Sequence, residues 1–167
     1  MNDELLYEVD ELDQPIGPRK RGDIHRLGLR HRAVHILVFN GRGELFLQKR
    51  SMAKDISPGH WDTSAAGHVD FGESYDDCAV RELNEELGVT DPAGLRFLFK
   101  LPASAATGHE FVQVYRLAHD GPLALNPEEI DAGRWFATSE IDAWLAASGE
   151  GLTRVFQFIW KTYRGAA

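Results

Sequence analysis

Residues 67–89, GHVDFGESYDDCAVRELNEELGV, form the stretch that decides the fold of this chain. It opens as a glycine-bounded loop and continues as a segment in which apolar residues recur every four positions, at Tyr75, Ala79, Leu83 and Leu87. This spacing predicts a helix over residues 75–87 with one buried stripe. Ser74 or Glu73 can accept hydrogen bonds from the free amides of the first turn, and Gly88 is placed to end the helix.

Three glutamates, Glu82, Glu85 and Glu86, dominate the polar side of the predicted helix. They are related by i, i+3 and i+4, so we expect all three to project from the side opposite the apolar stripe, with Cβ atoms about 5–6 Å apart. Like charges at that spacing repel each other, and a divalent cation such as Mg²⁺ would relieve the repulsion. A solvated charged helix is the alternative interpretation. We predict a metal-binding helix.

The same stretch resembles the Nudix box, G-x5-E-x7-R-E-U-x-E-E-x-G-U, in which U is an aliphatic residue. Every specified position is filled, by Gly67, Glu73, Arg81, Glu82, Leu83, Glu85, Glu86, Gly88 and Val89. A chance match in a chain of this length is on the order of 10⁻⁸ at ordinary residue frequencies. The resemblance implies an α/β fold, the Nudix-type α/β/α sandwich around a mixed β-sheet. It also implies a Mg²⁺ cofactor, with Mn²⁺ as an alternative.

The resemblance to the Nudix box implies roles for individual residues. The metal ligands would be the backbone carbonyl of Gly67 and the carboxylates of Glu82, Glu85 and Glu86. A pair formed by Glu73 and Arg81 would hold the loop and the helix in place. Glu85 is our first choice for the general base because it lies between the other two carboxylates on the helix. The alternatives for the base lie on other elements, at Glu110, Glu128 and Glu129.

Residues 45–73, LFLQKRSMAKDISPGHWDTSAAGHVDFGE, resemble the corresponding part of the type I isopentenyl diphosphate isomerases, which share the Nudix fold. This resemblance implies that Arg50 and Lys54 bind the diphosphate of the substrate. It also implies a second metal site, or a base, at His31, His68 and Glu110. His25 stands near a further ligand position of that family, but at a spacing one residue shorter. For His31 and His68, the alternative to metal binding is packing with hydrogen bonds.

The chain departs from the isomerase pattern at several positions. Ala66 stands where the isomerases have a cysteine that serves as an essential acid or base. Gly108 stands at the remaining acidic position of the isomerase metal site. The isomerases also lack the hydrolase box residues at Glu82 and Glu85, both of which this chain keeps. These differences favour a hydrolase built on an isomerase-like scaffold.

Length and composition limit the remaining possibilities. With 167 residues and 43% hydrophobic content, we expect a single domain over residues 1–167, with an N-terminal hairpin extension over about residues 1–30. The formal net charge of -8 argues against binding a nucleic acid polymer, so an anionic small-molecule diphosphate would be received by local cations or by metal. The acidic start and the lack of a long apolar run predict no signal peptide and no membrane span. The single cysteine, Cys78, favours a cytoplasmic location, and the protein is expected to be a monomer or a homodimer.

The rest of the chain reads as strands interleaved with helices. We predict strands over residues 5–9, 33–39, 44–48, 95–101, 110–117 and 133–136, a helix over about residues 139–147, and an apolar amphipathic segment over residues 152–163. The second and third of these strands are expected to form a hairpin in the middle of the sheet. Residues 25–32 are expected to be a basic connector, with phosphate contact as the alternative. Residues 102–109 are a candidate substrate lid.

These observations predict a Mg²⁺-dependent Nudix hydrolase that cleaves the diphosphate bond of a nucleoside diphosphate linked to another moiety, X. One alternative is an isopentenyl diphosphate isomerase-like enzyme, which Ala66 disfavours. Another is a non-catalytic nucleotide-binding sensor, which the intact box disfavours.

Overall fold

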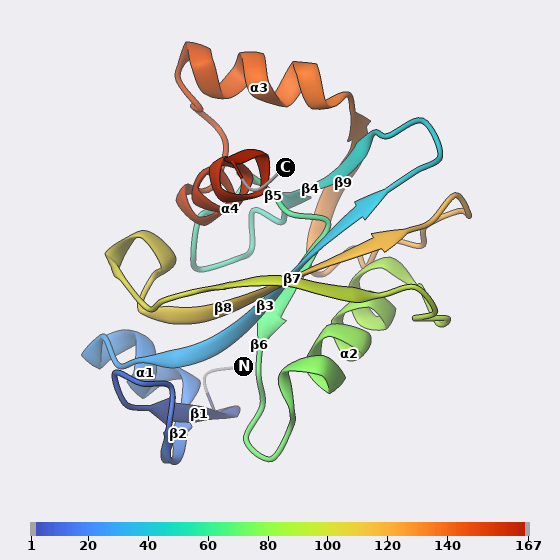
Figure 1. Ribbon diagram of the computed structural model, residues 1–167. Coiled ribbons are helices and arrows are strands. Elements are labelled where there is room, and N and C mark those ends of the chain that lie inside the picture. The colour runs from blue at the N-terminus through green and yellow to red at the C-terminus, as the bar shows by residue number, and fades with distance from the viewer. Residues whose placement is uncertain (1–2, 166–167) are drawn as a thin grey trace.

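The computed structural model describes residues 3–165, which form a seven-stranded mixed sheet, a separate two-stranded sheet and four α-helices (Figure 1). The strands are β1 (Leu5–Val9), β2 (Pro15–Lys20), β3 (His31–Phe39), β4 (Leu45–Arg50), β5 (Trp61–Asp62), β6 (Ala65–His68), β7 (Arg96–Leu101), β8 (Glu110–Ala118) and β9 (Ile130–Phe136). The helices are α1 (Arg21–Leu27), α2 (Tyr75–Leu87), α3 (Thr138–Ala147) and α4 (Arg154–Gly165), with a short 3₁₀ helix, η1 (Ala105–Thr107).

The central sheet has the strand order β5-β4-β3-β8-β7, with β6 also pairing with β3 and β9 also pairing with β4. Strands β3 and β8 run parallel, whereas the other pairs are antiparallel. The predicted hairpin of β3 and β4 is therefore wrong in its extent. The two strands pair only at Phe39 and Leu45, because β6 pairs with β3 over residues 33–36 and β9 pairs along β4.

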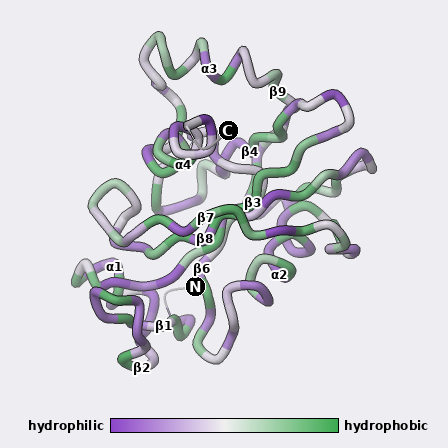
Figure 2. The backbone as a smooth tube through the Cα atoms, in the orientation of Figure 1, coloured by the Kyte–Doolittle hydropathy of each residue, from purple (hydrophilic) through white to green (hydrophobic). Residues whose placement is uncertain are grey.

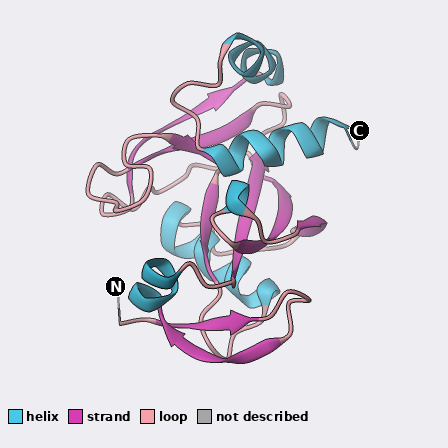
Figure 3. Ribbon diagram, turned by 90° about the vertical axis from the view of Figure 1, so that its left-hand side faces the viewer, coloured by secondary structure: helices cyan, strands magenta, loops and turns pink. Residues whose placement is uncertain are grey.

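Helices cover both faces of this sheet, which confirms the predicted α/β/α sandwich (Figures 1 and 3). Helix α2 packs on one face, where Leu83 and Leu87 join the cluster formed by the even-numbered residues of β3. Helices α3 and α4 cover the other face, where Phe156 and Trp160 join a second cluster. The alternation of side chains along each strand supplies both clusters. Hydrophobic residues accordingly gather along the crossing strands of the sheet (Figure 2).

Helix α2 begins and ends where the sequence predicts. The Ser74 hydroxyl accepts a hydrogen bond from the Asp77 amide at 3.0 Å, and Gly88 ends the helix with φ = 67°. The polar side of the helix differs from the prediction. Glu82 and Glu86 are 8% and 5% exposed, and only Glu85 points into solvent. Two of the three carboxylates thus lie at the edge of the core, where β6 and β4 cover them.

The N-terminal segment forms the predicted hairpin, β1 and β2, at one end of the molecule (Figure 3). The predicted connector is wrong in its first part, because residues 21–27 form helix α1. Ile24 is completely buried and anchors this helix, which ends at Gly28 with φ = 65°. This helix was not predicted because a single buried apolar residue in a strongly charged segment produces no helical repeat of apolar residues in the sequence.

Asp13 ties the hairpin to the rest of the fold. Its carboxylate accepts hydrogen bonds from Arg32 at 2.7 Å, from the Tyr75 hydroxyl at 2.7 Å and from Lys100. Burial by itself would raise the pKa of Asp13, but the hydrogen bonds from Arg32, Lys100 and Tyr75 lower it below the usual value near 3.8. Because the folded-state pKa is lowered, the ionised carboxylate stabilises the protein above that usual value, and this contribution is lost as the pH falls through the folded-state pKa.

Replacing Asp13 by asparagine is expected to lower the free energy of unfolding by about 2 kcal/mol at pH 7, because Arg32 and Lys100 lose the buried carboxylate that they share. Asparagine tolerates the φ of 61° found at this position, so the change isolates the charge. Urea unfolding should show that the difference from the wild type shrinks as the pH falls below about 4. Asp23→Asn, which removes an exposed pair with Arg26, is the control and should change stability by less than about 0.5 kcal/mol. An Asp13→Asn protein as stable as this control would contradict the prediction.

Candidate active site

A hollow of about 400 Å³ lies where α2, β6, the loop after β4 and the N-terminus of α4 meet. Its size falls within the range of small-ligand sites. Most of the predicted site residues line it, namely Arg50, Lys54, Gly67, His68, Arg81, Glu82, Glu85, Glu86 and Glu110. Of the remaining predictions, Glu73 contacts Arg81, and His31 contacts Glu110. The fold therefore gathers the Nudix box and the isomerase-like residues around one hollow.

Gly67 lies directly against Glu82. A Cβ atom built on Gly67 would stand 2.1 Å from the Glu82 Oε1 atom, which is far inside van der Waals contact. Only glycine allows strand β6 to approach the carboxylate this closely. The requirement for glycine at the start of the box is thus steric, and it brings the Gly67 backbone next to the acidic face of α2.

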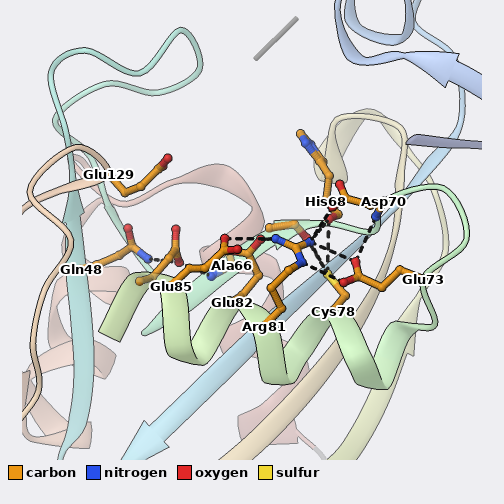
Figure 4. A network of polar contacts seen from close by, with 12 residues as sticks. Gln48, Ala66, His68, Asp70, Glu73, Cys78, Arg81, Glu82, Glu85 and Glu129 are labelled. Atoms are coloured by element: carbon orange, nitrogen blue, oxygen red, sulfur yellow. Dashed lines mark hydrogen bonds and ion pairs between the residues drawn. The ribbon is translucent and has the colours of Figure 1, made fainter. Parts of the chain in front are cut away.

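Arg81 forms the centre of a polar network that joins the loop to the helix (Figure 4). Its guanidinium donates two hydrogen bonds to Glu73, at 2.8 and 3.0 Å, and one to the His68 carbonyl at 3.1 Å. It also donates to Glu82 at 2.7 Å and to Glu85 at 3.2 Å. The paired geometry of two N–H groups on one carboxylate fixes orientation as well as distance. Arg81 thus holds the loop and two glutamates in register.

The buried glutamates of α2 sit in surroundings that oppose their ionisation. Burial, together with the charge of Glu86, raises the pKa of Glu82 to about 9. Burial also raises the pKa of Glu86 to about 7, although hydrogen bonds from the Ala66 amide at 2.8 Å and the Gln48 side chain act in the opposite direction. Adjacent carboxylates in a poorly solvated site gain most from a cation.

The donor set fits a hard divalent cation. The carboxylates of Glu82, Glu85 and Glu86 all line the hollow, and Gly67 adjoins the first of them. Mg²⁺ prefers oxygen ligands of this kind and usually retains places for water and substrate phosphate. The raised pKa values of Glu82 and Glu86 are consistent with binding of a divalent cation, because the cation would stabilise their ionised forms.

Cationic side chains also line the hollow, and the predicted Arg50 and Lys54 are among them. Lys54 forms an ion pair with Glu129, and the Arg50 guanidinium donates to the Ile56 carbonyl at 3.0 Å and lies 3.7 Å from Asp62. Arg21, which the sequence interpretation did not single out, also lines the hollow and makes a bidentate pair with Asp55 at 3.0 and 3.1 Å. Its place at the first residue of α1 explains the omission, since that helix was not predicted.

Three histidines form a cluster beside the hollow that α2 lines. Ligand nitrogens of His25, His31 and His68 lie within 4.8 Å of one another. Glu110 joins them, since its Oε2 atom accepts hydrogen bonds from His68 at 2.8 Å and from His31 at 3.2 Å. Burial would raise the pKa of Glu110, but the hydrogen bonds from His31 and His68 hold it well below its usual range. Burial and the neighbouring cationic groups lower the pKa of His25 to about 4.

His31 has an oxygen atom beside each of its two ring nitrogens. Its Nδ1 atom faces the Leu29 carbonyl at 2.9 Å and its Nε2 atom faces Glu110, so both ring nitrogens face oxygen acceptors. A neutral imidazole carries one proton and satisfies only one of these contacts. His25 was recognised in the sequence only at a displaced spacing. Helix α1 brings it to the cluster, with its ring centroid 5.2 Å from that of His68.

Comparisons with known proteins agree with this arrangement. The sequence model of the NUDIX domain matches residues 29–156. An uncharacterised Nudix hydrolase from Pseudomonas aeruginosa is 41% identical over 135 residues, which cover 79% of this chain and 78% of that protein. A protein named isopentenyl-diphosphate Delta-isomerase from Serratia proteamaculans is 34% identical over 164 residues, 95% of this chain and 90% of its own length. A crystal structure from Deinococcus radiodurans superposes with a TM-score of 0.85 at 31% identity and covers 95% of this chain and 98% of its own.

The chain belongs to the Nudix family, and it is a hydrolase that acts on pyrophosphate bonds. The predicted family resemblance is thereby confirmed. No helix within residues 3–165 combines the length and the apolar character needed to cross a membrane.

Proposed function

We propose that the protein is a Mg²⁺-dependent pyrophosphohydrolase that cleaves the diphosphate bond of a nucleoside diphosphate linked to a moiety X. The observation that carries the proposal is the pair of buried carboxylates, Glu82 and Glu86, at the edge of a hollow that also presents cationic side chains. A Mg²⁺ ion held by Glu82, Glu85, Glu86 and the Gly67 carbonyl would supply neutralisation of the diphosphate charge. Mn²⁺ is the alternative ion.

The chain's own residues would divide the remaining work. Arg50 and Lys54 would bind the diphosphate oxygens, which requires Lys54 to exchange its ion pair with Glu129 for one with the substrate. Glu73 and Arg81 would keep α2 and its loop in position. Glu85 would accept the proton of the attacking water, since its carboxylate lines the hollow and is 55% exposed to solvent.

The isomerase alternative depends on position 66. Ala66 uses its amide to donate a hydrogen bond to Glu86 at 2.8 Å, and its methyl side chain carries no group that can transfer a proton. Carbon protonation at this position therefore lacks its acid or base. Several relatives of similar identity are nevertheless named isomerases, so isopentenyl diphosphate belongs among the substrates tested.

A panel of substrates tests the proposed function. The purified protein would be incubated with Mg²⁺ or Mn²⁺ and with nucleoside di- and triphosphates, sugar nucleotides, dinucleoside polyphosphates, coenzyme A and isopentenyl diphosphate. Release of phosphate, pyrophosphate or a nucleoside monophosphate from a nucleoside diphosphate derivative is the expected result. Rearrangement of isopentenyl diphosphate without hydrolysis would support the isomerase instead. Tight nucleotide binding without turnover would support the non-catalytic sensor.

We also propose a second metal site, or a base, at His31, His68 and Glu110, with His25 completing the cluster. The support is the close approach of the three histidines and the two oxygen contacts of His31. His68→Ala should lower the metal content of protein purified without chelator by about one equivalent, measured by elemental analysis. His60→Ala, an exposed residue that contacts the Pro58 carbonyl, is the matched control and should retain the wild-type content. Equal metal contents in the two variants would exclude a metal ion at the histidines.

A further inference from the structure

A second hollow adjoins the candidate active site on the side of α4. It has a volume of about 550 Å³ and shares Ala106 and Arg154 with the first hollow. Its other lining residues are Gln157, Phe158, Lys161 and Thr162. All of these except Ala106 lie on α4 at spacings of three and four residues, so they follow one side of the helix. We call this hollow the α4 groove. It forms a surface path that leads away from the candidate diphosphate site.

The α4 groove is basic in a chain of net charge -8. Helix α4 carries Arg154, Lys161 and Arg164 and contains no acidic residue. Arg164 lies outside the groove and is paired with Asp142 at 2.9 Å. Within residues 3–165, neither of the other two has a carboxylate partner, and Arg154 donates only to the Ala105 carbonyl at 3.4 Å. Both are exposed.

Arg154 and Lys161 differ in this respect from Lys54 and Arg21 in the first hollow, which are paired with carboxylates. Lys54 is held by Glu129, and Arg21 is held by Asp55. A ligand anion must compete with those carboxylates, whereas it meets no such competition at Arg154 and Lys161. The two groove cations are therefore positioned to bind an anionic group on an extended ligand.

The length and the lining of the α4 groove indicate what kind of ligand fits. Lys161 lies seven positions after Arg154, which corresponds to about 10 Å along the helix axis. That length suits one nucleoside-sized unit beyond the diphosphate. Phe158 lies between the two cations and is half-buried, so it offers apolar surface to a flat ring. An anionic group at the far end would then reach Lys161.

We propose that the α4 groove binds the part of the substrate distal to the scissile diphosphate, and that this part carries a further phosphate. The inference rests on the proposed pyrophosphohydrolase function, which it narrows to phosphorylated nucleoside diphosphate derivatives. Arg154, at the boundary of the two hollows, contacts the chain of the substrate, and Lys161 contacts the distal phosphate.

Two matched pairs of compounds test the α4 groove: coenzyme A against 3′-dephospho-coenzyme A, and NADP⁺ against NAD⁺. The members of each pair differ by one phosphate remote from the diphosphate. Dissociation constants would be measured by titration calorimetry without divalent metal, so that no turnover interferes. The phosphorylated member of at least one pair should bind about tenfold more tightly to the wild-type protein. This preference should fall to less than about twofold in Lys161→Gln and weaken at high salt.

Arg164→Gln is the control, because it removes a cation from the same helix outside the groove, and it should retain the wild-type preference. Thermal unfolding of each variant would verify that it is folded. Three outcomes would overturn the proposal that the α4 groove binds a distal phosphate. They are equal affinities within both pairs, no binding of any of the four compounds, and a preference retained in Lys161→Gln. If the preference depends on Lys161 but the protein hydrolyses none of the substrate panel, the proposed hydrolase function is wrong and phosphate binding by the α4 groove is supported.

Discussion

Glu85→Gln is expected to lower kcat by about 1,000-fold, within the range of roughly 10²–10⁴ found for loss of a general base. The amide keeps the size of the side chain and its ability to accept the hydrogen bond from Arg81, but it cannot take a proton. Steady-state rates over a range of pH, at saturating Mg²⁺, provide the measurement.

The other candidate bases provide the comparison for Glu85. Glu110→Gln, Glu128→Gln and Glu129→Gln would be assayed in the same way. Glu129 is paired with Lys54, so its loss is expected to affect KM more than kcat. Near-normal turnover in Glu85→Gln would contradict the assignment, and a comparable loss of kcat in one of the other variants would transfer the role to that residue.

Glu82→Gln is expected to weaken Mg²⁺ binding and to lower turnover at limiting Mg²⁺ by at least about 100-fold, because a buried anionic ligand is lost. The metal-free variant should in contrast be more stable than the metal-free wild type. Burial and nearby carboxylates raise the pKa of Glu82 to about 9, so between its usual pKa and 9 the folded protein keeps this group protonated whereas the unfolded chain ionises it, and this difference destabilises the fold. This destabilisation increases as the pH rises toward 9, and the glutamine removes it.

The measurement of the Glu82 effect pairs Mg²⁺ titration of activity with thermal unfolding in chelator between pH 5 and pH 9. The stability gain of Glu82→Gln should grow with pH across this range. Glu11→Gln, an exposed change in the turn between β1 and β2, is the control for loss of one negative charge. Unchanged Mg²⁺ dependence in Glu82→Gln would exclude this carboxylate from the metal site.

The helix α2 could be predicted from the sequence because every signal for it is local. Its apolar stripe, its cap at Ser74 and its stop at Gly88 all lie within fifteen residues. Burial of Glu82 and Glu86 could not be predicted, because it depends on β6 and β4, which approach from outside the helix. The same reason explains the error at the hairpin of β3 and β4, since the residues that separate these strands come from elsewhere in the chain.

The candidate site was predicted where a family pattern covered it and missed where only tertiary structure reveals it. The Nudix box and the isomerase-like segment identified residues that the fold brings to one hollow. His25 and Arg21 escaped a firm assignment because helix α1 has a single fully buried residue, Ile24, within a run of charges. The position of α1 against the histidine cluster follows from tertiary packing, and a helix of only seven residues is too short for its apolar pattern to predict that packing.

The parallel ladder between β3 and β8 has a practical consequence for protein engineering. Its first pair joins His31 to Glu110, and eight further pairs continue to Phe39 and Ala118. A deletion of one residue inside β8 would turn Glu110 to the opposite face of the sheet, whereas the preceding segment over residues 102–109 lies outside the ladder. Loop transplants from other members of the family can therefore vary residues 102–106, but they should keep Thr107, whose hydroxyl donates to the Glu110 carbonyl at 2.7 Å, and His109, whose carbonyl accepts from the His31 amide at 3.2 Å. The boundary for such grafts is therefore Ala106.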